Sequence, residues 1–156
     1  MKKKSSQLPL RKGVGIVLLN NKNKIFVAKR IDNPKNFWQM PQGGVDNKEK
    51  YLKAALRELK EETSITSVEL IKEIDEWYTY ELPEYLLGKI WKGKFRGQKQ
   101  KWFIMKFLGN ENEIKLNTKN PEFFEWKWIK IDELTNVVVK FKFDVYKKIY
   151  EELKKL

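Results

Sequence analysis

The residues best suited to chemistry are acidic and lie close together in the stretch "GGVDNKEKYLKAALRELKEETSI", which runs from Gly43 to Ile65. A helix through Glu58, Glu61 and Glu62 places these carboxylates on one narrow stripe, because they are three or four residues apart. Like charges at that spacing destabilise a helix by roughly a few tenths of a kcal/mol per pair. Something outside the helix should offset this repulsion between the carboxylates. Mg²⁺ is a cation that prefers carboxylate oxygens. The alternative is a solvated charged face, which is common in a chain with 35% charged residues.

The neighbouring residues predict how this helix begins and packs. Asp46 is expected to cap it, with Glu49 returning a bond to the backbone of the cap. Gly43 and Gly44 come just before, where the backbone must turn tightly or approach a ligand closely. A separate apolar stripe is expected to face the core, formed by Leu52, Ala55, Leu56 and Leu59.

The chain contains no cysteine and no histidine. Disulfides, zinc sites with the usual ligands, cysteine nucleophiles, Ser-His triads and histidine phosphotransfer are therefore excluded. A Walker A loop, which would cradle phosphates in another way, is also missing from the sequence. Any catalysis must use carboxylates, lysine, tyrosine or a metal ion.

Gly43, Glu49 and the run Arg57-Glu58-Leu59-Lys60-Glu61-Glu62 together resemble the Nudix box. The resemblance implies an α/β fold, the Nudix α/β/α sandwich with a mixed sheet, a central box helix and a C-terminal helix. One position departs from the pattern, because the family usually has glycine where Ser64 stands, and this leaves open how the helix ends.

The same resemblance implies the roles of the acidic residues. It implies that the metal ligands are Glu58, Glu61 and Glu62 with a carbonyl near Gly43, and that Arg57 orients a box glutamate. A further acidic residue normally joins from outside the box. Glu122 in "NPEFFEWKW" is the candidate, as a ligand or as the general base, and the alternative is an ordinary loop carboxylate.

Other segments narrow the resemblance to bacterial RNA 5′ pyrophosphohydrolases and the related plant-type dinucleoside tetraphosphate hydrolases. These segments are "RKGVGIV", "WQMPQGG", "GQKQKWF", "PEFFEWKW" and "VVKFKFDVY". The resemblance implies that Phe141 stacks on a base beside Lys142, and the alternative for Phe141 is a core contact of the last helix. It also implies a group of residues near the phosphates: Arg11, Arg30, Gln98, Lys99 and Gln100.

The function expected from this resemblance is Mg²⁺-dependent hydrolysis of a phosphoanhydride bond, with Mn²⁺ as a substitute. The leading substrate is the triphosphorylated 5′ end of RNA, from which pyrophosphate is removed. A second hypothesis is hydrolysis of dinucleoside polyphosphates such as diadenosine tetraphosphate. A third, from another class, is an RNA-binding Nudix module without catalysis.

Composition sets the remaining expectations. A chain of 156 residues suits a single domain over residues 1–156, with residues 1–9 as a flexible basic tail. The net charge of +12 favours polyanionic substrates, although a lysine-rich composition bias explains part of it. Because no apolar run follows the basic start and none approaches a membrane span, a soluble cytoplasmic protein is expected, with no membrane contact. No obligate protein partner is inferred.

The elements that must position these residues follow from local patterns. "VGIVLLNNKNKIFVAKR" predicts two strands with an Asn-rich turn, and "SVELIKEIDEWYTYELP" predicts one strand. "YLLGKIWKGKFRGQKQ" is typical of a basic loop, whereas "KWFIMKFLG" and "FFEWKWIKI" predict strands. A closing helix is predicted over residues 140–156 by Phe141, Val145, Ile149 and Leu153 at helical spacing.

Overall fold

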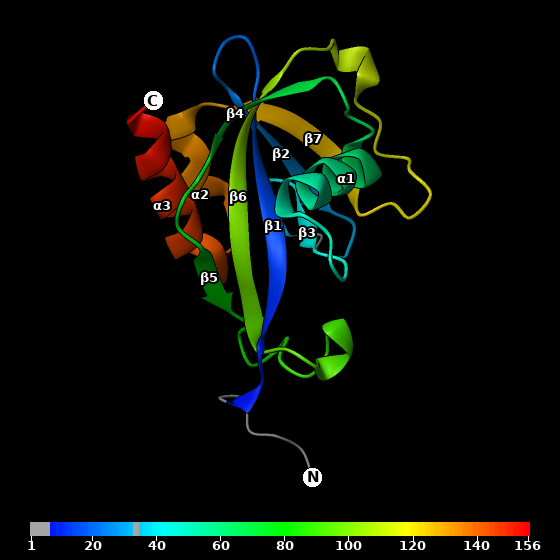
Figure 1. Cartoon of the computed structure of the whole chain (residues 1–156), viewed down its shortest axis with the longest axis vertical. Helices are drawn as coiled ribbons and strands as arrows, with labels where there is room; N and C mark the ends of the chain where they lie inside the picture. The colour runs from blue at the N-terminus through cyan, green and yellow to red at the C-terminus, as the bar shows by residue number, and fades with distance from the viewer. Residues whose placement is uncertain (1–6, 33–34) are drawn as a thin grey trace.

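The computed structural model describes residues 7–32 and 35–156, and it shows a central sheet with helices on both faces (Figure 1). The strands are β1 (Leu10–Leu19), β2 (Ile25–Arg30), β3 (Gln42–Gly44), β4 (Val68–Glu73), β5 (Tyr78–Glu81), β6 (Gly97–Phe107) and β7 (Phe123–Ile129). The α-helices are α1 (Tyr51–Thr63), α2 (Leu134–Val137) and α3 (Phe143–Lys154). Short 3₁₀ helices are η2 (Trp91–Gly93), η3 (Glu111–Glu113), η4 (Ile131–Glu133) and η5 (Lys140–Lys142).

The sheet contains parallel and antiparallel strand pairs, so it is mixed, as the resemblance to the family implied. Its main order is β4-β6-β1-β2-β7, and β3 pairs with β1 while β5 pairs with β6. β1 and β6 run parallel from Leu10 opposite Gly97 to Leu19 opposite Lys106, and the other pairs are antiparallel. Because Gly44 lies opposite Gly13, β3 holds the two glycines of the box beside the first half of β1.

Alternation along the strands supplies a hydrophobic core to each face of the sheet. One core joins Val14 and Ile16 of β1 to Leu59 of α1. The other joins Val17 of β1 to Tyr146 and Ile149 of α3. α1 therefore covers one face while α2 and α3 cover the other (Figure 1), which confirms the expected α/β/α sandwich.

The helix that carries the box begins later than predicted. α1 starts at Tyr51 with Lys50 in the N-cap position, and no side chain caps it. Glu49 does accept a bond from the backbone N–H of Asp46 at 2.9 Å, but in the turn before the helix. The prediction that Asp46 caps the helix is therefore wrong. Its partner Glu49 instead lies within reach of Arg57, which binds the Glu49 carboxylate.

The buried face of α1 is rotated from the predicted apolar stripe towards the carboxylates. Leu56, predicted to face the core, is 41% exposed. The buried residues are Ala54, Ala55, Leu59, Glu62 and Thr63. The periodicity of apolar residues missed this rotation because Glu62 counts as polar in the pattern and yet lies on the buried side.

Three strand and loop boundaries also differ from the sequence prediction. The single strand predicted before Pro83 is two strands, β4 and β5, which pair with different parts of β6. Gly97 to Gln100, predicted in a loop, form the start of β6 because they pair with β5. Phe141 lies in η5 rather than in the closing helix, which begins at Phe143.

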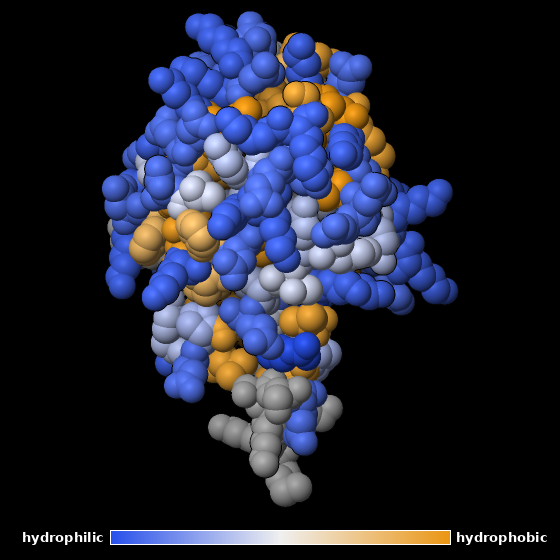
Figure 2. All heavy atoms as spheres, turned by 90° about the vertical axis from the view of Figure 1, so that its left-hand side faces the viewer, coloured by the Kyte–Doolittle hydropathy of each residue, from blue (hydrophilic) through white to orange (hydrophobic). Residues whose placement is uncertain are grey.

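The surface is strongly hydrophilic, in line with a mean hydropathy of -0.66. Figure 2 shows hydrophilic side chains over most of the face that carries α3, with smaller hydrophobic areas between them. Of the helices in the described parts of the chain, none has the length and apolar character needed to span a membrane. Residues 1–6 of the expected flexible tail lie outside the described residues, whereas the Leu8 and Pro9 carbonyls accept bonds from Arg96.

Candidate active site

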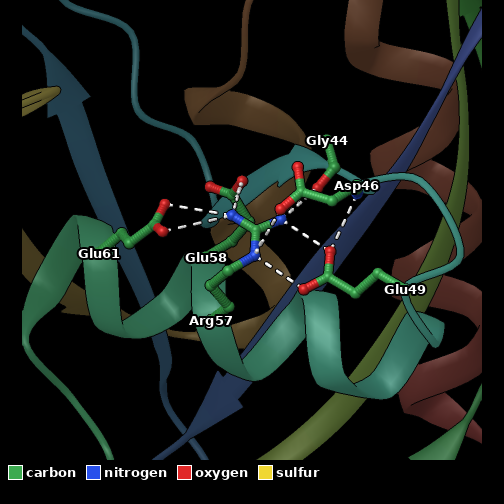
Figure 3. A network of polar contacts seen from close by, with 6 residues as sticks. All are labelled: Gly44, Asp46, Glu49, Arg57, Glu58 and Glu61. Carbon is green, nitrogen blue, oxygen red and sulfur yellow. Dashed lines mark hydrogen bonds and ion pairs between the residues drawn. The ribbon is translucent and has the colours of Figure 1, made fainter.

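Arg57 organises the box by binding several acidic groups at once (Figure 3). Its Nε donates to Glu49 at 2.8 Å, and its Nη1 donates to Glu58 at 2.9 Å and to Glu61 at 3.2 Å. Its Nη2 donates to the carbonyl of Gly44 at 2.9 Å, which ties the helix to β3. The Arg57 guanidinium and the Asp46 amide together lower the pKa of Glu49 to about 2. These hydrogen bonds hold the Arg57 guanidinium between Glu49, Glu58 and Glu61. The orienting role that the resemblance implies for Arg57 stays a prediction.

The packing of Glu58 against β3 requires glycine at position 43. A Cβ atom on Gly43 would collide with the Glu58 carboxylate, and a Cβ on Gly44 would collide with the guanidinium of Arg11. Both glycines therefore allow charged side chains to lie directly on the backbone of β3. This brings the β3 backbone against the first carboxylate of the box.

The three box glutamates differ sharply in exposure. The Glu61 side chain is 57% exposed and that of Glu58 is 13% exposed. Glu62 is only 2% exposed, and among the described residues neither of its carboxylate oxygens has a hydrogen-bond partner. The three carboxylates of the stripe therefore do not share one environment, because α1 turns Glu62 towards the sheet.

The charge of Glu122 influences the pKa values of Glu58 and Glu62. Burial raises the pKa of Glu62 well above its usual value, and Glu122 and Glu58 add to the shift. Burial also raises the pKa of Glu58, against the opposing effect of Arg57. Desolvation beside the cleft raises the pKa of Glu122, although its side chain is exposed, and the charge of Asp32 adds to the effect. A cation bound among these carboxylates would stabilise their charged forms, which burial and mutual repulsion disfavour.

The site fits a hard divalent cation. All the available donors are oxygens, which Mg²⁺ prefers, and the unpartnered carboxylate of Glu62 is costly to bury without a counter-charge. Within residues 7–32 and 35–156, no three acidic side chains form a ready-made metal-binding group. Arg57 holds oxygens of Glu58 and Glu61 for which a metal ion would compete.

A cleft of about 630 Å³ opens beside Glu58 and Glu122, whereas Glu61 and Glu62 are not among its lining residues. Glu58, Gly43 and Glu122 lie at one part of its wall. The other lining residues include Arg11, Arg30, Phe141 and Lys142, which the sequence resemblance assigned to substrate binding. Segments far apart in the chain thus bring acidic, cationic and aromatic groups to one cavity.

The remaining substrate-binding candidates do not line this cleft. Gln98 and Gln100 are fully buried behind it, where Gln100 donates to Gln98 at 2.9 Å and the Tyr80 hydroxyl donates to Gln98 at 3.0 Å. Lys99 lies on the opposite face of β6, with its Nζ 5.2 Å from the centre of the Trp77 ring. The alternation of β6 separates the lysine from its two neighbours, because successive side chains point to opposite faces of a strand.

Phe141 and Lys142 form one wall with Tyr80. The Phe141 and Tyr80 ring centres are 5.7 Å apart, and Lys142 Nζ lies 5.5 Å from the centre of the Tyr80 ring. Lys142 is 6% exposed and donates to Gln39 at 3.3 Å. Burial, with the nearby charge of Arg30, lowers its pKa to about 7. Phe141 is half-buried, packs on the core and also lines the cleft, and its stacking on a base stays a prediction.

Several cleft residues were missed by the sequence reasoning. They include Asp32, which binds Arg30 through two hydrogen bonds of 2.8 Å, together with Gln42, Tyr80 and Trp91. Tyr80 alternates with exposed residues in β5, which is a signal for an inward-facing position. Trp91 has no such signal, because its loop shows no periodicity.

Comparisons with known proteins identify the family to which the chain belongs. The NUDIX domain family model matches residues 9–153, and the chain belongs to this family. It is 67% identical over 149 residues to an RNA pyrophosphohydrolase of Pelagibacter ubique (strain HTCC1062), covering 96% of this chain and 94% of that protein. It is 46% identical over 154 residues to an RNA pyrophosphohydrolase of Rickettsia conorii (strain ATCC VR-613 / Malish 7), covering 99% and 96%.

Solved structures show the same fold at lower identity. The E. coli dihydroneopterin triphosphate pyrophosphohydrolase matches with a TM-score of 0.69 and 18% identity, over 92% of this chain and 99% of that one. A C. elegans Ap4A hydrolase matches with a TM-score of 0.67 and 23% identity, over 94% and 100%. Family and relatives together identify the class of this enzyme, a Nudix pyrophosphohydrolase.

Proposed function

We propose that the protein removes pyrophosphate from the triphosphorylated 5′ end of RNA and leaves a 5′ monophosphate. The observation that supports this most is the cleft that joins Glu58 and Glu122 to Arg11, Arg30, Lys142 and the ring of Phe141. Cationic groups suit a polyphosphate, and an aromatic ring suits a base. The relatives named as RNA pyrophosphohydrolases favour RNA as the substrate. The proposal places the enzyme in the cytoplasm, where RNA is made and degraded.

The proposed metal-binding residues are Glu58, Glu61, Glu62 and the carbonyl of Gly43, with Glu122 as a further ligand or as the base that accepts a proton from water. Mg²⁺, with Mn²⁺ as a substitute, would lower the pKa of the attacking water and neutralise phosphate charge. Glu62 supports this assignment because its two buried oxygens lack partners in the protein. Arg57 holds Glu58 against β3, so that carboxylate is already placed beside the cleft.

The other proposed contacts concern the substrate itself. Arg30 and Lys142 bind the triphosphate, since both line the cleft and lie close enough for Arg30 to influence the pKa of Lys142. Arg11 approaches from β1 on the Gly44 side. Phe141 receives a base, beside the cation of Lys142. In the reaction, a phosphoanhydride bond breaks as water adds to phosphorus, and pyrophosphate leaves.

The test compares triphosphorylated RNA with diadenosine tetraphosphate as substrates of the purified protein, with Mg²⁺, with Mn²⁺ and with a chelator. We expect a higher kcat/KM for RNA, pyrophosphate as the released product, and no turnover with the chelator. A higher kcat/KM for diadenosine tetraphosphate would reassign the substrate. Absence of any metal-stimulated phosphate release would instead favour an RNA-binding module.

A further inference from the structure

Arg11 differs from the other arginines of the chain in its partners. Arg30 is paired with Asp32, Arg57 with Glu49 and Glu58, and Arg96 with Glu81. Among the ion pairs of the described residues, none involves Arg11, although it lines the cleft. Its charge is therefore not neutralised by a carboxylate partner.

The Arg11 guanidinium is held by contacts that are not ionic. The Trp91 ring centre lies 5.2 Å from Arg11 Cζ, which is within the range of a cation–π interaction. On the other side, Arg11 lies so close to Gly44 that a Cβ there would collide with Nη2. Trp91 also lines the cleft. The indole ring and the β3 backbone thus confine the guanidinium at the cleft wall.

Trp91 reaches this place through an unusual backbone conformation. The φ angles are 53° at Trp91, 57° at Lys92 and 70° at Gly93, all in the left-handed region. A bulky aromatic residue rarely adopts that conformation, because its Cβ then lies close to the neighbouring backbone. The turn is kept by bonds from Gly93 N to Ile90 O at 3.0 Å and from Lys94 N to Trp91 O at 3.2 Å.

The segment that carries Trp91 is attached to the start of β1. The Arg96 N–H donates to Pro9 O at 3.0 Å, and the Leu82 N–H donates to Arg96 O at 2.8 Å. The segment between β5 and β6 projects beside the start of β1 at the lower end of the sheet (Figure 1). Phe95 packs edge-on against Trp91, with 6.2 Å between the ring centres. The tryptophan is therefore fixed relative to Arg11 from both ends of the segment.

We propose that Trp91 is a positioning residue, whose left-handed turn holds the indole ring against Arg11 so that the N–H groups of Arg11 stay free for the phosphates of the substrate. This inference rests on the proposed function for the identity of that substrate. A cation–π contact with an aromatic ring does not occupy the N–H donors of a guanidinium as a carboxylate does, so they stay available. A carboxylate partner would occupy those donors, as Asp32 does for Arg30.

The first test observes Arg11 directly, without turnover. NMR of protein labelled with ¹⁵N-arginine resolves the Nε–H signals, and the Arg11→Lys variant identifies that of Arg11. In Trp91→Ala we expect this signal to shift before any ligand is added, because the ring current of the indole is lost. Inorganic tripolyphosphate in metal-free buffer is the probe, and its Kd should rise by about 2-fold to 30-fold, the range of a cation–π interaction.

Two further variants separate the role of the ring from general packing. Trp91→Phe keeps an aromatic face and should retain most of the affinity. Trp91→Leu keeps apolar bulk against Phe95 and should behave like Trp91→Ala, so a folding defect in the alanine variant does not decide the result. Trp77→Ala is the matched control. Like Trp91, Trp77 packs edge-on against another aromatic ring and has cations over its own ring, but it does not line the cleft. It should leave the Kd unchanged.

A double-mutant cycle completes the test. If Trp91 acts through Arg11, the losses of affinity in Trp91→Ala and Arg11→Ala should not add in the double variant. Additive losses, or an Arg11 signal that is identical in Trp91→Ala and the unsubstituted protein, would overturn the inference. Failure of the unsubstituted protein to hydrolyse triphosphorylated RNA would overturn only the proposed function, because the arginine signals and tripolyphosphate binding are measured without RNA.

Discussion

Glu62 is the residue whose environment most needs a ligand. It is 2% exposed, its oxygens lack partners, and Glu122 and Glu58 add to the effect of burial on its pKa. Its burial costs stability in the metal-free protein, because transferring an unpaired polar group costs about 1–3 kcal/mol in mutational studies. The same burial makes Glu62 a strong candidate ligand once a divalent cation is bound.

For Glu62→Gln we expect opposite effects on stability and activity. The metal-free variant should melt at a higher temperature, since a neutral amide replaces the carboxylate. Turnover should fall by roughly 100-fold or more, because even residues behind the metal ligands contribute about 10-fold to 100-fold. The rise in melting temperature on adding Mg²⁺ should be largely lost, since a ligand that binds only the folded state stabilises it.

Glu61→Gln is the control for this comparison. Its side chain is 57% exposed, so the metal-free melting temperature should hardly change while turnover still falls. A lower melting temperature in Glu62→Gln, with the response to Mg²⁺ intact, would show that Glu62 is structural.

Phe141 has contacts on both the cleft and the core, so its replacement should affect both. For Phe141→Ala we expect about 5-fold to 150-fold weaker binding of triphosphorylated RNA, the range of one lost base–aromatic stack of roughly 1–3 kcal/mol. Inorganic tripolyphosphate, which has no base, should bind almost as well as before. A moderate loss of stability should accompany this, because the ring packs beside Tyr80.

Phe143→Ala provides the matched control, since Phe143 is 41% exposed and does not line the cleft. Equal weakening of RNA and tripolyphosphate binding in Phe141→Ala would place the residue in the core and remove it from the base site.

At the scale of elements, the end of α1 shows how the chain tolerates a departure from the box pattern. Ser64 adopts the left-handed conformation, with φ 68°, that glycine usually provides at a helix end. Its Oγ donates to the carbonyl of Lys115 at 2.9 Å, which offsets part of the conformational cost. The helix therefore ends where the box pattern requires, and the buried Glu62 keeps its position.

The two small replacements of Ser64 should differ in stability. Ser64→Ala loses the hydrogen bond and keeps the left-handed strain, so we expect it to be less stable than Ser64→Gly by about 1 kcal/mol. kcat should be unchanged in both. Urea unfolding measures the difference, and an alanine variant as stable as the glycine variant would show that the backbone at this position is not strained.

At the scale of the whole molecule, a chain with a net charge of +12 carries an acidic candidate site. A basic surface raises the local concentration of polyanions, and binding then releases counterions from the nucleic acid. RNA carries phosphates beyond its 5′ end, whereas a dinucleoside polyphosphate carries only the phosphates that bridge its two nucleosides. The surface charge should therefore favour RNA over the smaller substrate at low salt.

This difference can be measured as a salt dependence. We expect log KM to rise with log salt concentration more steeply for a triphosphorylated RNA of about ten nucleotides than for diadenosine tetraphosphate, by a slope of about 0.7 for each additional phosphate contacted. Coinciding slopes would mean that only contacts within the cleft attract RNA.

The relative positions of the candidate metal-binding glutamates and of several elements follow from the local sequence. The spacing of Glu58, Glu61 and Glu62 places them on one side of a single helix, and helical spacing needs no knowledge of the rest of the fold. The hairpin of β1 and β2 and the buried positions Val145, Ile149 and Leu153 of α3 also follow from local periodicity. These features depend on residues close in the chain, whose relative positions are set by backbone geometry.

Tertiary structure decided what the spacing could not. The burial of Glu62 depends on how α1 rotates against the sheet, and its coupling to Glu122 depends on how the start of β7 is placed. Pairing with β5 turned Gln98 to Gln100 into a strand and separated Lys99 from its neighbours. The cation–π contact between Trp91 and Arg11 joins a loop without periodicity to the first strand. Each of these contacts links residues far apart in sequence, and strand order and register bring them together in ways that no local pattern records.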